Sequence, residues 1–322
     1  MKRFVLVALL ALLPVCTFAA DTPVKAVMIN GLRYEASLAS QAVAPKTLLE
    51  IALGTGKENV GSDEQDAEHR TEGAPYAFCA LKDGSVWVLD TINQKLKHFS
   101  AEGKCLTEVA FPEHPEKFAR IRDFAIGPKE SFYFLCSTDG KVERVDGQGK
   151  LITEIEGLSD VWEIGADPKG NVLVKNPAMN ALMRFNPEGE LIESYDGQAD
   201  YSVYTDADGH PYGVRSDDKN AVLFKLTAAS PTASIDLAKF PLELAAGNKA
   251  HYYSARVCGV DQTGTIYLEL IAGDDDGVIH QNRLLKVSPD GKTLGKLEML
   301  NTPFMAPDLP RHRVVMPDGR HE

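Results

Sequence analysis

Six copies of one turn-and-strand unit follow one another along this chain, and this repetition constrains the fold more than any other feature. In each copy a tight turn precedes a short run of β-branched and aromatic residues, as in residues 83–89. A polar turn and a second alternating run follow, as in residues 91–99. If the second residue of the first turn is the anchor, the units are anchored at positions 84, 130, 170, 209, 264 and 319. Short alternating runs between turn residues predict antiparallel strands.

The spacing of the anchors predicts the size of the repeating unit. Successive anchors lie 39 to 55 residues apart, which suits a propeller blade of four strands. No amphipathic stretch of helical period competes with this pattern outside the N-terminus. The sequence therefore predicts an all-β protein, a six-bladed β-propeller of four-stranded antiparallel blades.

Closure of the ring has to involve the N-terminal part of the chain. The sixth unit stops three residues after Gly319, so its outer strands must come from elsewhere. Residues 24–29, 32–36 and 47–53 are strand-like, and closure with strands from both termini leaves no open edge. We expect residues 20–74 to contribute to ring closure, with a loop over residues 54–74, and residues 75–322 to form the propeller. The alternative is a truncated C-terminus.

The first unit carries a more specific pattern. It reads Asp83-Gly84-Ser85-Val86-Trp87-Val88-Leu89-Asp90-Thr91-Ile92-Asn93-Gln94-Lys95-Leu96. This stretch resembles the NHL repeat, in which an Asp-Gly turn precedes a valine–aspartate–threonine–x–asparagine segment and a basic residue. The other units keep the strand–turn layout but lose the Asp and the Asn. The resemblance implies the propeller fold, but not one activity, because such propellers include both binding modules and enzymes.

The N-terminus has the organisation of a secretory signal. Lys2 and Arg3 precede an unbroken apolar run over residues 4–13, and small residues follow a proline. We predict cleavage after Ala19 and a mature chain in the periplasm or outside the cell, with no membrane span. A retained anchor is one alternative. Lipidation at Cys16 is another, although Val15 before it is larger than lipobox processing prefers.

The charge balance argues against two classes of partner. The chain has 34 basic and 46 acidic residues and a formal net charge of −12. Removal of Lys2 and Arg3 with the signal would make the mature chain still more negative. A phosphate backbone or an anionic membrane surface rewards clustered Lys and Arg, so we expect no nucleic-acid partner.

Four cysteines remain after the predicted cleavage: Cys79, Cys105, Cys136 and Cys258. Export permits disulfides, and four cysteines allow three pairings. Their wide spacing contains no C-x-x-C motif, so it indicates neither a zinc site nor a redox pair. Because each lies in or beside a predicted strand, the alternative is that all four are small buried core residues.

Metal-binding and catalytic motifs are weak in this sequence. No nucleophile elbow, H-E-x-x-H, P-loop or Rossmann glycine pattern occurs. Asp206 and Asp208 resemble the start of a calcium loop, but no Glu follows at the twelfth position and the segment coincides with a repeat turn. The run Asp274, Asp275 and Asp276 could hold Ca²⁺ to relieve charge repulsion, or could be a solvated loop. We therefore predict no catalytic residue and no cofactor other than this candidate Ca²⁺.

The repeat register supplies a better candidate site. The first strand of each propeller blade is innermost, and its start rims the central channel. Eight residues before each anchor the chain has three arginines and three aromatic residues: Tyr76, Arg122, Trp162, Tyr201, Arg256 and Arg311. The positions two residues later are mostly apolar and predict core. Arg offers a planar fork for carboxylate or phosphate, and aromatic rings offer flat faces, so we expect these six to form a ligand site at one channel mouth.

Two functions from different classes fit this pattern. The first is an exported, non-catalytic binding or scaffold propeller that recognises a protein, peptide or glycan, with an anionic ligand favoured by the arginines. The alternative is a metal-dependent hydrolase-like, lactonase-like or lyase-like propeller enzyme. Such sites resemble a channel-centred metal held by acids, Asn or His, and the six positions contain none of these. The sequence therefore favours the binding protein.

Overall fold

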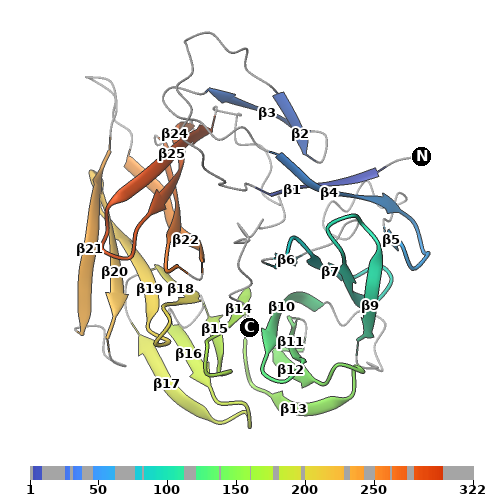
Figure 1. Ribbon diagram of the computed structural model, residues 1–322. Coiled ribbons are helices and arrows are strands. Elements are labelled where there is room, and N and C mark those ends of the chain that lie inside the picture. Colours follow the sequence, from blue (N-terminus) through green and yellow to red (C-terminus); the bar gives the residue numbers. More distant parts are fainter. Residues whose placement is uncertain are drawn as a thin grey trace.

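The chain is all-β in the computed structural model (Figure 1). The structure describes residues 3–8, 26–29, 32–37, 46–61, 77–81, 83–111, 121–137, 139–159, 161–176, 181–196, 200–227, 233–242, 251–261, 263–273 and 279–299. Among these residues, no helix is long and apolar enough to cross a membrane.

Five consecutive meanders form complete four-stranded antiparallel blades. The first consists of β6 (Phe78–Ala80), β7 (Val86–Asp90), β8 (Lys95–Phe99) and β9 (Cys105–Ala110). The second consists of β10 (Ile121–Gly127), β11 (Ser131–Cys136), β12 (Lys141–Val145) and β13 (Leu151–Ile155). The third consists of β14 (Glu163–Ala166), β15 (Val172–Asn176), β16 (Ala181–Phe185) and β17 (Leu191–Asp196). The fourth consists of β18 (Asp200–Thr205), β19 (Pro211–Ser216), β20 (Asn220–Leu226) and β21 (Ser234–Pro241). The fifth consists of β22 (His251–Val260), β23 (Ile266–Gly273), β24 (Ile279–Val287) and β25 (Thr293–Met299).

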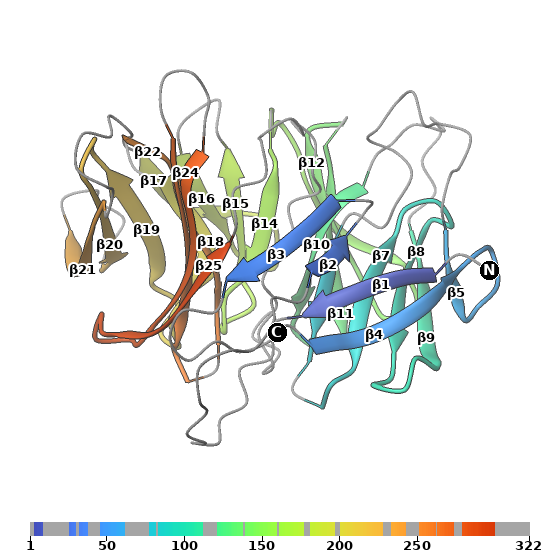
Figure 2. The same ribbon diagram turned by 90° about the horizontal axis from the view of Figure 1, so that it is seen from above.

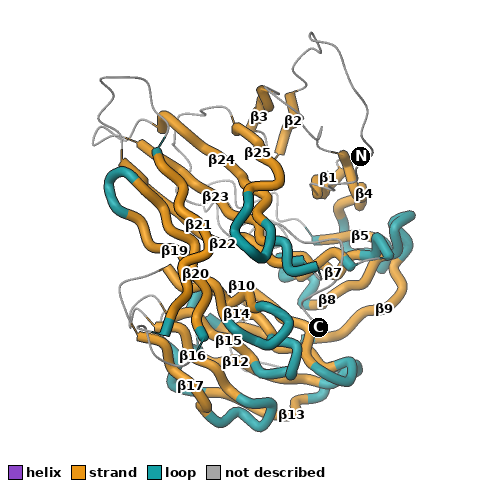
Figure 3. Tube along the Cα trace, turned by 60° about the vertical axis from the view of Figure 1, so that its left-hand side comes forward, coloured by secondary structure: helices purple, strands orange, loops and turns teal. Residues whose placement is uncertain are grey.

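The blades are arranged around a common axis as in a six-bladed β-propeller, which confirms the predicted fold class. The first strand of each blade lies innermost and the last lies at the periphery (Figure 1). The tube in Figure 3 shows the same strand layers from the side. Innermost strands of neighbouring blades, such as β10 and β14 or β18 and β22, contact one another. The anchor positions at residues 84, 130, 170, 209 and 264 all fall in the turn between the first two strands, and position 319 lies outside the described residues.

One five-residue turn recurs in seven of the described hairpins. It begins with Asp, Asn or Ser, and its fourth residue is a Gly with positive φ whose amide donates to the carbonyl of the first residue. The first side chain also accepts hydrogen bonds from later amides of the turn; Asp167 Oδ1, for example, accepts from Lys169 N at 2.9 Å and Asn171 N at 3.0 Å. Gly is required at the fourth position because it alone adopts this φ without strain. The turns begin at Ser100, Asp146, Asp167, Asn186, Asp206, Asp261 and Ser288.

Apolar side chains between the blades form the core. Phe124, Ile164, Val203 and Cys258, from the predicted core register of the innermost strands, are at most 6% exposed. The neighbouring second strands are buried over most of their length, because both faces of an inner strand are covered by adjacent blades. This burial confirms the assignment of these positions to the core.

The N-terminal strands lie on both sides of the sixth blade position. β4 (Lys46–Leu53) pairs with β1 (Arg3–Ala8) and with β5 (Asn59–Val60), and this three-stranded sheet packs on the first blade (Figure 2). β2 (Ala26–Ile29) and β3 (Leu32–Ser37) form a hairpin that pairs with β25 of the fifth blade. The three segments expected to be strands are therefore strands. Two details differ from expectation: part of the predicted signal is strand β1, and β5 lies within the expected loop.

A buried polar cluster joins the N-terminal sheet to the first blade. Lys97 Nζ lies 3.0 Å from Asp90 Oδ2, and both side chains are 1% exposed. The same ammonium donates to Asn59 O at 2.7 Å, while Asp90 Oδ1 accepts from Gly61 N at 2.9 Å. Asn93 Nδ2 donates to Asp90 Oδ2 and to Gly54 O. We call Asp90, Asn93 and Lys97 the closure clamp, because they hold residues 54–61 on the blade.

Candidate functional site

Four of the six predicted site residues lie in or beside the innermost strands of four blades. Arg122, Tyr201 and Arg256 belong to the innermost strands β10, β18 and β22, and Trp162 immediately precedes β14. Because the blades are related by rotation about a common axis, their innermost strands run the same way and begin at the same end. We call this end the channel mouth. Arg122, Trp162 and Tyr201 lie at these strand starts, whereas Arg256 is the sixth of the ten residues of β22. Tyr76 and Arg311 lie outside the described residues.

Arg256 is neutralised from within the chain. Its Nε donates to Glu269 Oε2 at 2.6 Å, and the two residues are directly opposite each other on β22 and β23. Burial disfavours the charged guanidinium, but Glu269 and the more distant Glu163 outweigh burial and raise the pKa of Arg256. Its charge is therefore committed to acids of the protein.

Arg122 and Trp162 are the solvent-facing members of the set. Arg122 is exposed, and Trp162 is 48% exposed. Their strands are joined at this point by Asp123, whose buried carboxylate accepts from Phe124 N through Oδ1 and from Ile164 N through Oδ2, both at 2.9 Å. This bridge between β10 and β14 fixes the backbone beside both side chains. A cation and a flat aromatic face are thus presented from adjacent blades.

Tyr201 is placed differently from its register neighbours. It is 4% exposed, and its ring meets Phe224 of β20 edge-on, with centroids 6.1 Å apart. Gly213, which lies opposite Phe224 on β19, leaves room for the Phe224 ring, because a Cβ at that position would lie 2.4 Å from it. Tyr201 is thus part of the core beneath the mouth rather than of its exposed surface.

The four cysteines predicted to persist in the mature chain are all buried thiols. The alternative that they are core residues is therefore confirmed, and none forms a disulfide in this structure. Burial and the charge of Glu269 raise the pKa of the Cys258 thiol, near the mouth, to about 12. A thiol in this state is a poor nucleophile.

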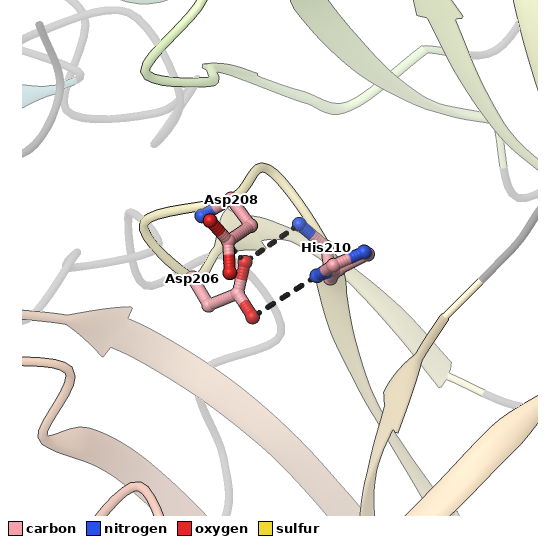
Figure 4. A group of neighbouring side chains, drawn as sticks. All are labelled: Asp206, Asp208 and His210. Atoms are coloured by element: carbon pink, nitrogen blue, oxygen red, sulfur yellow. Dashed lines mark hydrogen bonds and ion pairs between the residues drawn. The ribbon is translucent and has the colours of Figure 1, made fainter.

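Within the described residues, one group has the composition of a metal site. Asp206, Asp208 and His210 place one ligand atom each within 4.8 Å of one another (Figure 4). They form the five-residue turn between β18 and β19: Asp206 Oδ1 accepts from the amides of Asp208 and His210. Asp274, Asp275 and Asp276, the other acidic candidates, lie outside the described residues.

A lysine of the chain itself already neutralises the carboxylate at the start of this turn. Lys225 Nζ lies 3.0 Å from Asp206 Oδ2. Although burial raises the pKa of Asp206, the hydrogen bonds from His210 and Lys225 outweigh it and hold that pKa below its ordinary value. In the preceding blade Arg184 lies beside Asp167 in the same way. The group in Figure 4 is thus a repeated structural turn, as its coincidence with the repeat indicated.

The site reasoning from the sequence missed these basic residues on the third strands. In each of the strands β8, β12, β16, β20 and β24, the residue before the last is basic: His98, Arg144, Arg184, Lys225 and Lys286. Alignment of the third strands, rather than of the turns alone, would have revealed a basic residue in each of the five blades that the structure describes.

Comparisons with known proteins agree with an all-β repeat and go no further. No family model and no curated protein matches this chain. Virginiamycin B lyase from Staphylococcus aureus is 12% identical, with a TM-score of 0.43 over 72% of this chain and 71% of that one. Regucalcin from Agrobacterium tumefaciens, a calcium-binding protein, is 14% identical, with a TM-score of 0.42 over 69% and 73%. A protein of unknown function from Bacteroides caccae is 19% identical, with a TM-score of 0.44 over 70% and 81%. Likeness at this level assigns neither an activity nor a ligand.

Proposed function

We propose that this protein is an exported, non-catalytic binding propeller that recognises an anionic group on a peptide, protein or glycan at its channel mouth. The observation that carries the proposal is the exposure of Trp162 beside Arg122. The chain's other tryptophan, Trp87, is 8% exposed. Half-exposed aromatic rings beside a guanidinium are typical of recognition surfaces.

The two side chains suit different parts of one ligand. The Arg122 guanidinium would pair with a carboxylate, sulfate or phosphate, and the Trp162 ring would stack on a sugar or an apolar side chain. Arg256, Glu269 and Glu163 would form the polar floor of the mouth, since their charges already oppose one another. The NHL-like pattern of the first unit is consistent with a binding module but does not select a ligand.

Binding to peptide and glycan arrays tests this function. We compare the chain that starts at Ala20 with its Arg122→Ala and Trp162→Ala variants, and with Lys104→Ala as a control. Lys104 is also exposed, but it lies in the peripheral turn before β9. The proposal predicts an anionic ligand class whose binding weakens with salt and falls about 10- to 100-fold in both mouth variants, as expected for a lost charge-assisted or stacking contact.

Three outcomes would contradict the proposal. The first is that every bound ligand is retained by both mouth variants. The second is that Lys104→Ala loses binding as much as Arg122→Ala. The third is chemical turnover of a bound ligand. Turnover would identify an enzyme, whether or not removal of metal abolishes it.

A further inference from the structure

β4 occupies the place of the outermost strand in the sixth blade. In the second blade, the turn at Gly149 packs on β9 of the blade before it, where an added Cβ would lie 2.5 Å from Ala110 O. In the first blade, the equivalent turn at Gly103 packs on β4, where an added Cβ would lie 3.3 Å from Leu49 Cδ1. Leu49 and Ile51 are buried with the core of the first blade. β4 is therefore fixed to its neighbour as a fourth strand is.

The strand that pairs with β4 comes from an unexpected segment. In all five complete blades the fourth strand pairs with the third strand of the same meander. β4 is instead paired antiparallel with β1, through six residue pairs from Arg3↔Ala52 to Ala8↔Lys46 (Figure 2). All of β1 lies within the predicted signal, which cleavage after Ala19 would remove.

If the sixth blade were a meander like the other five, β3 would be the partner of β4. In the structure β3 is instead paired with β25, through a short contact. β3 directly precedes β4 in the sequence, and consecutive strands in this fold pair antiparallel. β3 pairs with β25 through only two residue pairs, Glu298↔Ser37 and Met299↔Ala36. Eight residues separate the end of β3 from the start of β4, and their extended reach of about 26 Å exceeds the distance of about 5 Å between paired strands.

We propose that β1 is a placeholder, and that its removal lets the hairpin of β2 and β3 leave β25 and pair through β3 with β4. The proposal rests on the export that the proposed function includes. Removal of β1 would leave the edge of β4 without backbone partners, and an open edge favours the nearest strand of matching polarity. β3 would have that polarity, because strands that follow one another within each meander of this fold pair antiparallel. The exchange would give the sixth blade the strand order of the other five.

Hydrogen exchange in two forms of the whole protein tests the exchange of strands. One form begins at Met1 and the other at Ala20, so the comparison does not depend on a protease. We expect the amides of β4 to be protected in both forms and those of β3 to exchange about tenfold more slowly, or slower still, in the shorter form. The full-length Leu6→Pro variant should behave like the shorter form, since proline cannot complete the β1 ladder.

The results separate this proposal from the prediction of export. Fast exchange of β4 in the chain that begins at Ala20 would overturn the proposal, because the edge would then stay open. Unchanged exchange of β3 would overturn it as well. N-terminal sequencing of the cell-derived protein tests export independently: a start near Ala20 supports it, and an intact Met1 species in the membrane fraction contradicts it without affecting the exchange result.

Discussion

An aromatic–basic pair of residues on the second and third strands recurs in four of the five blades that the structure describes. The basic residue near the end of the third strand lies opposite an aromatic residue of the second strand in four blades. In the first blade the rings of Trp87 and His98 stack, with centroids 4.4 Å apart. In the second, Arg144 lies over the ring of Tyr133. These contacts combine ring packing with the attraction of a cation for a π face. The pairs are Trp87↔His98, Tyr133↔Arg144, Tyr212↔Lys225 and Tyr267↔Lys286.

His98 should make stability depend on pH. Its Nε2 lies 2.8 Å from Ser85 Oγ, which in turn donates to Asp83 Oδ1. Burial lowers the pKa of His98, although the charge of Asp83 partly opposes this. The unfolded chain therefore binds the proton more readily, and stability is lost as the pH falls below about 6.5.

Urea unfolding at pH 7.5 and at pH 5.5 tests this dependence. The wild-type protein should lose more free energy of unfolding between the two pH values than the His98→Gln variant, whose side chain does not titrate. Equal losses in the two proteins would show that His98 does not contribute.

The turn of the second blade contains strain that glycine should relieve. Lys129 and Glu130 both have positive φ, at 55° and 56°. Three other first turns, which begin with an Asp, have a glycine at the position of Glu130. We expect Glu130→Gly to raise the free energy of unfolding by about 0.5–1 kcal/mol, because the strained conformation costs glycine nothing. The matched control is Lys169→Gly, since Lys169 lies in the equivalent turn of the third blade without a positive φ; this change should destabilise. Thermal unfolding of both variants measures the difference, and a destabilised Glu130→Gly would contradict it.

At the scale of the element, the closure clamp explains why only the first unit keeps the NHL-like residues. Asp90 ends β7 and Lys97 is the third residue of β8. The corresponding residues are Cys136 and Glu143 in the second blade, and Asn176 and Met183 in the third. Only the first blade receives residues 54–61 on this surface, so only there does a buried Lys–Asp pair gain backbone partners.

Removing one partner of the clamp should be costly. Lys97→Met, which introduces the residue of the third blade, would leave the Asp90 carboxylate buried and uncompensated. We expect a loss of about 3–5 kcal/mol of unfolding free energy. The double variant Asp90→Asn with Lys97→Met should lose less than the sum of the two single variants, because no isolated charge remains. Denaturant unfolding of all three variants measures the coupling, and strictly additive losses would contradict the clamp.

At the scale of the whole molecule, the fold could be predicted from the sequence because each unit contains the turn residues and the alternating strands that form its own blade. The turn at Asp206 and the alternating strands after it are local features, and the regular spacing implies a ring. Which site residues are buried and which are paired with acids could not be predicted in this way. Tyr201 and Trp162 share one register, but the space beside Gly213 admits Phe224 and buries Tyr201. The pairing of Arg256 with Glu269 likewise depends on the strand register, which the turn anchors alone do not specify.

The central claim is that the channel mouth binds a ligand at Trp162, and the fluorescence of this side chain tests it most directly. The chain has two tryptophans, so the Trp87→Phe variant reports on Trp162 alone. Its emission should be titrated with a ligand selected from the peptide and glycan arrays. We predict a saturable blue shift, together with reduced quenching by acrylamide, because the ligand would cover a ring that is now half in water. Emission and quenching that stay unchanged at saturating ligand would place binding elsewhere and contradict the account.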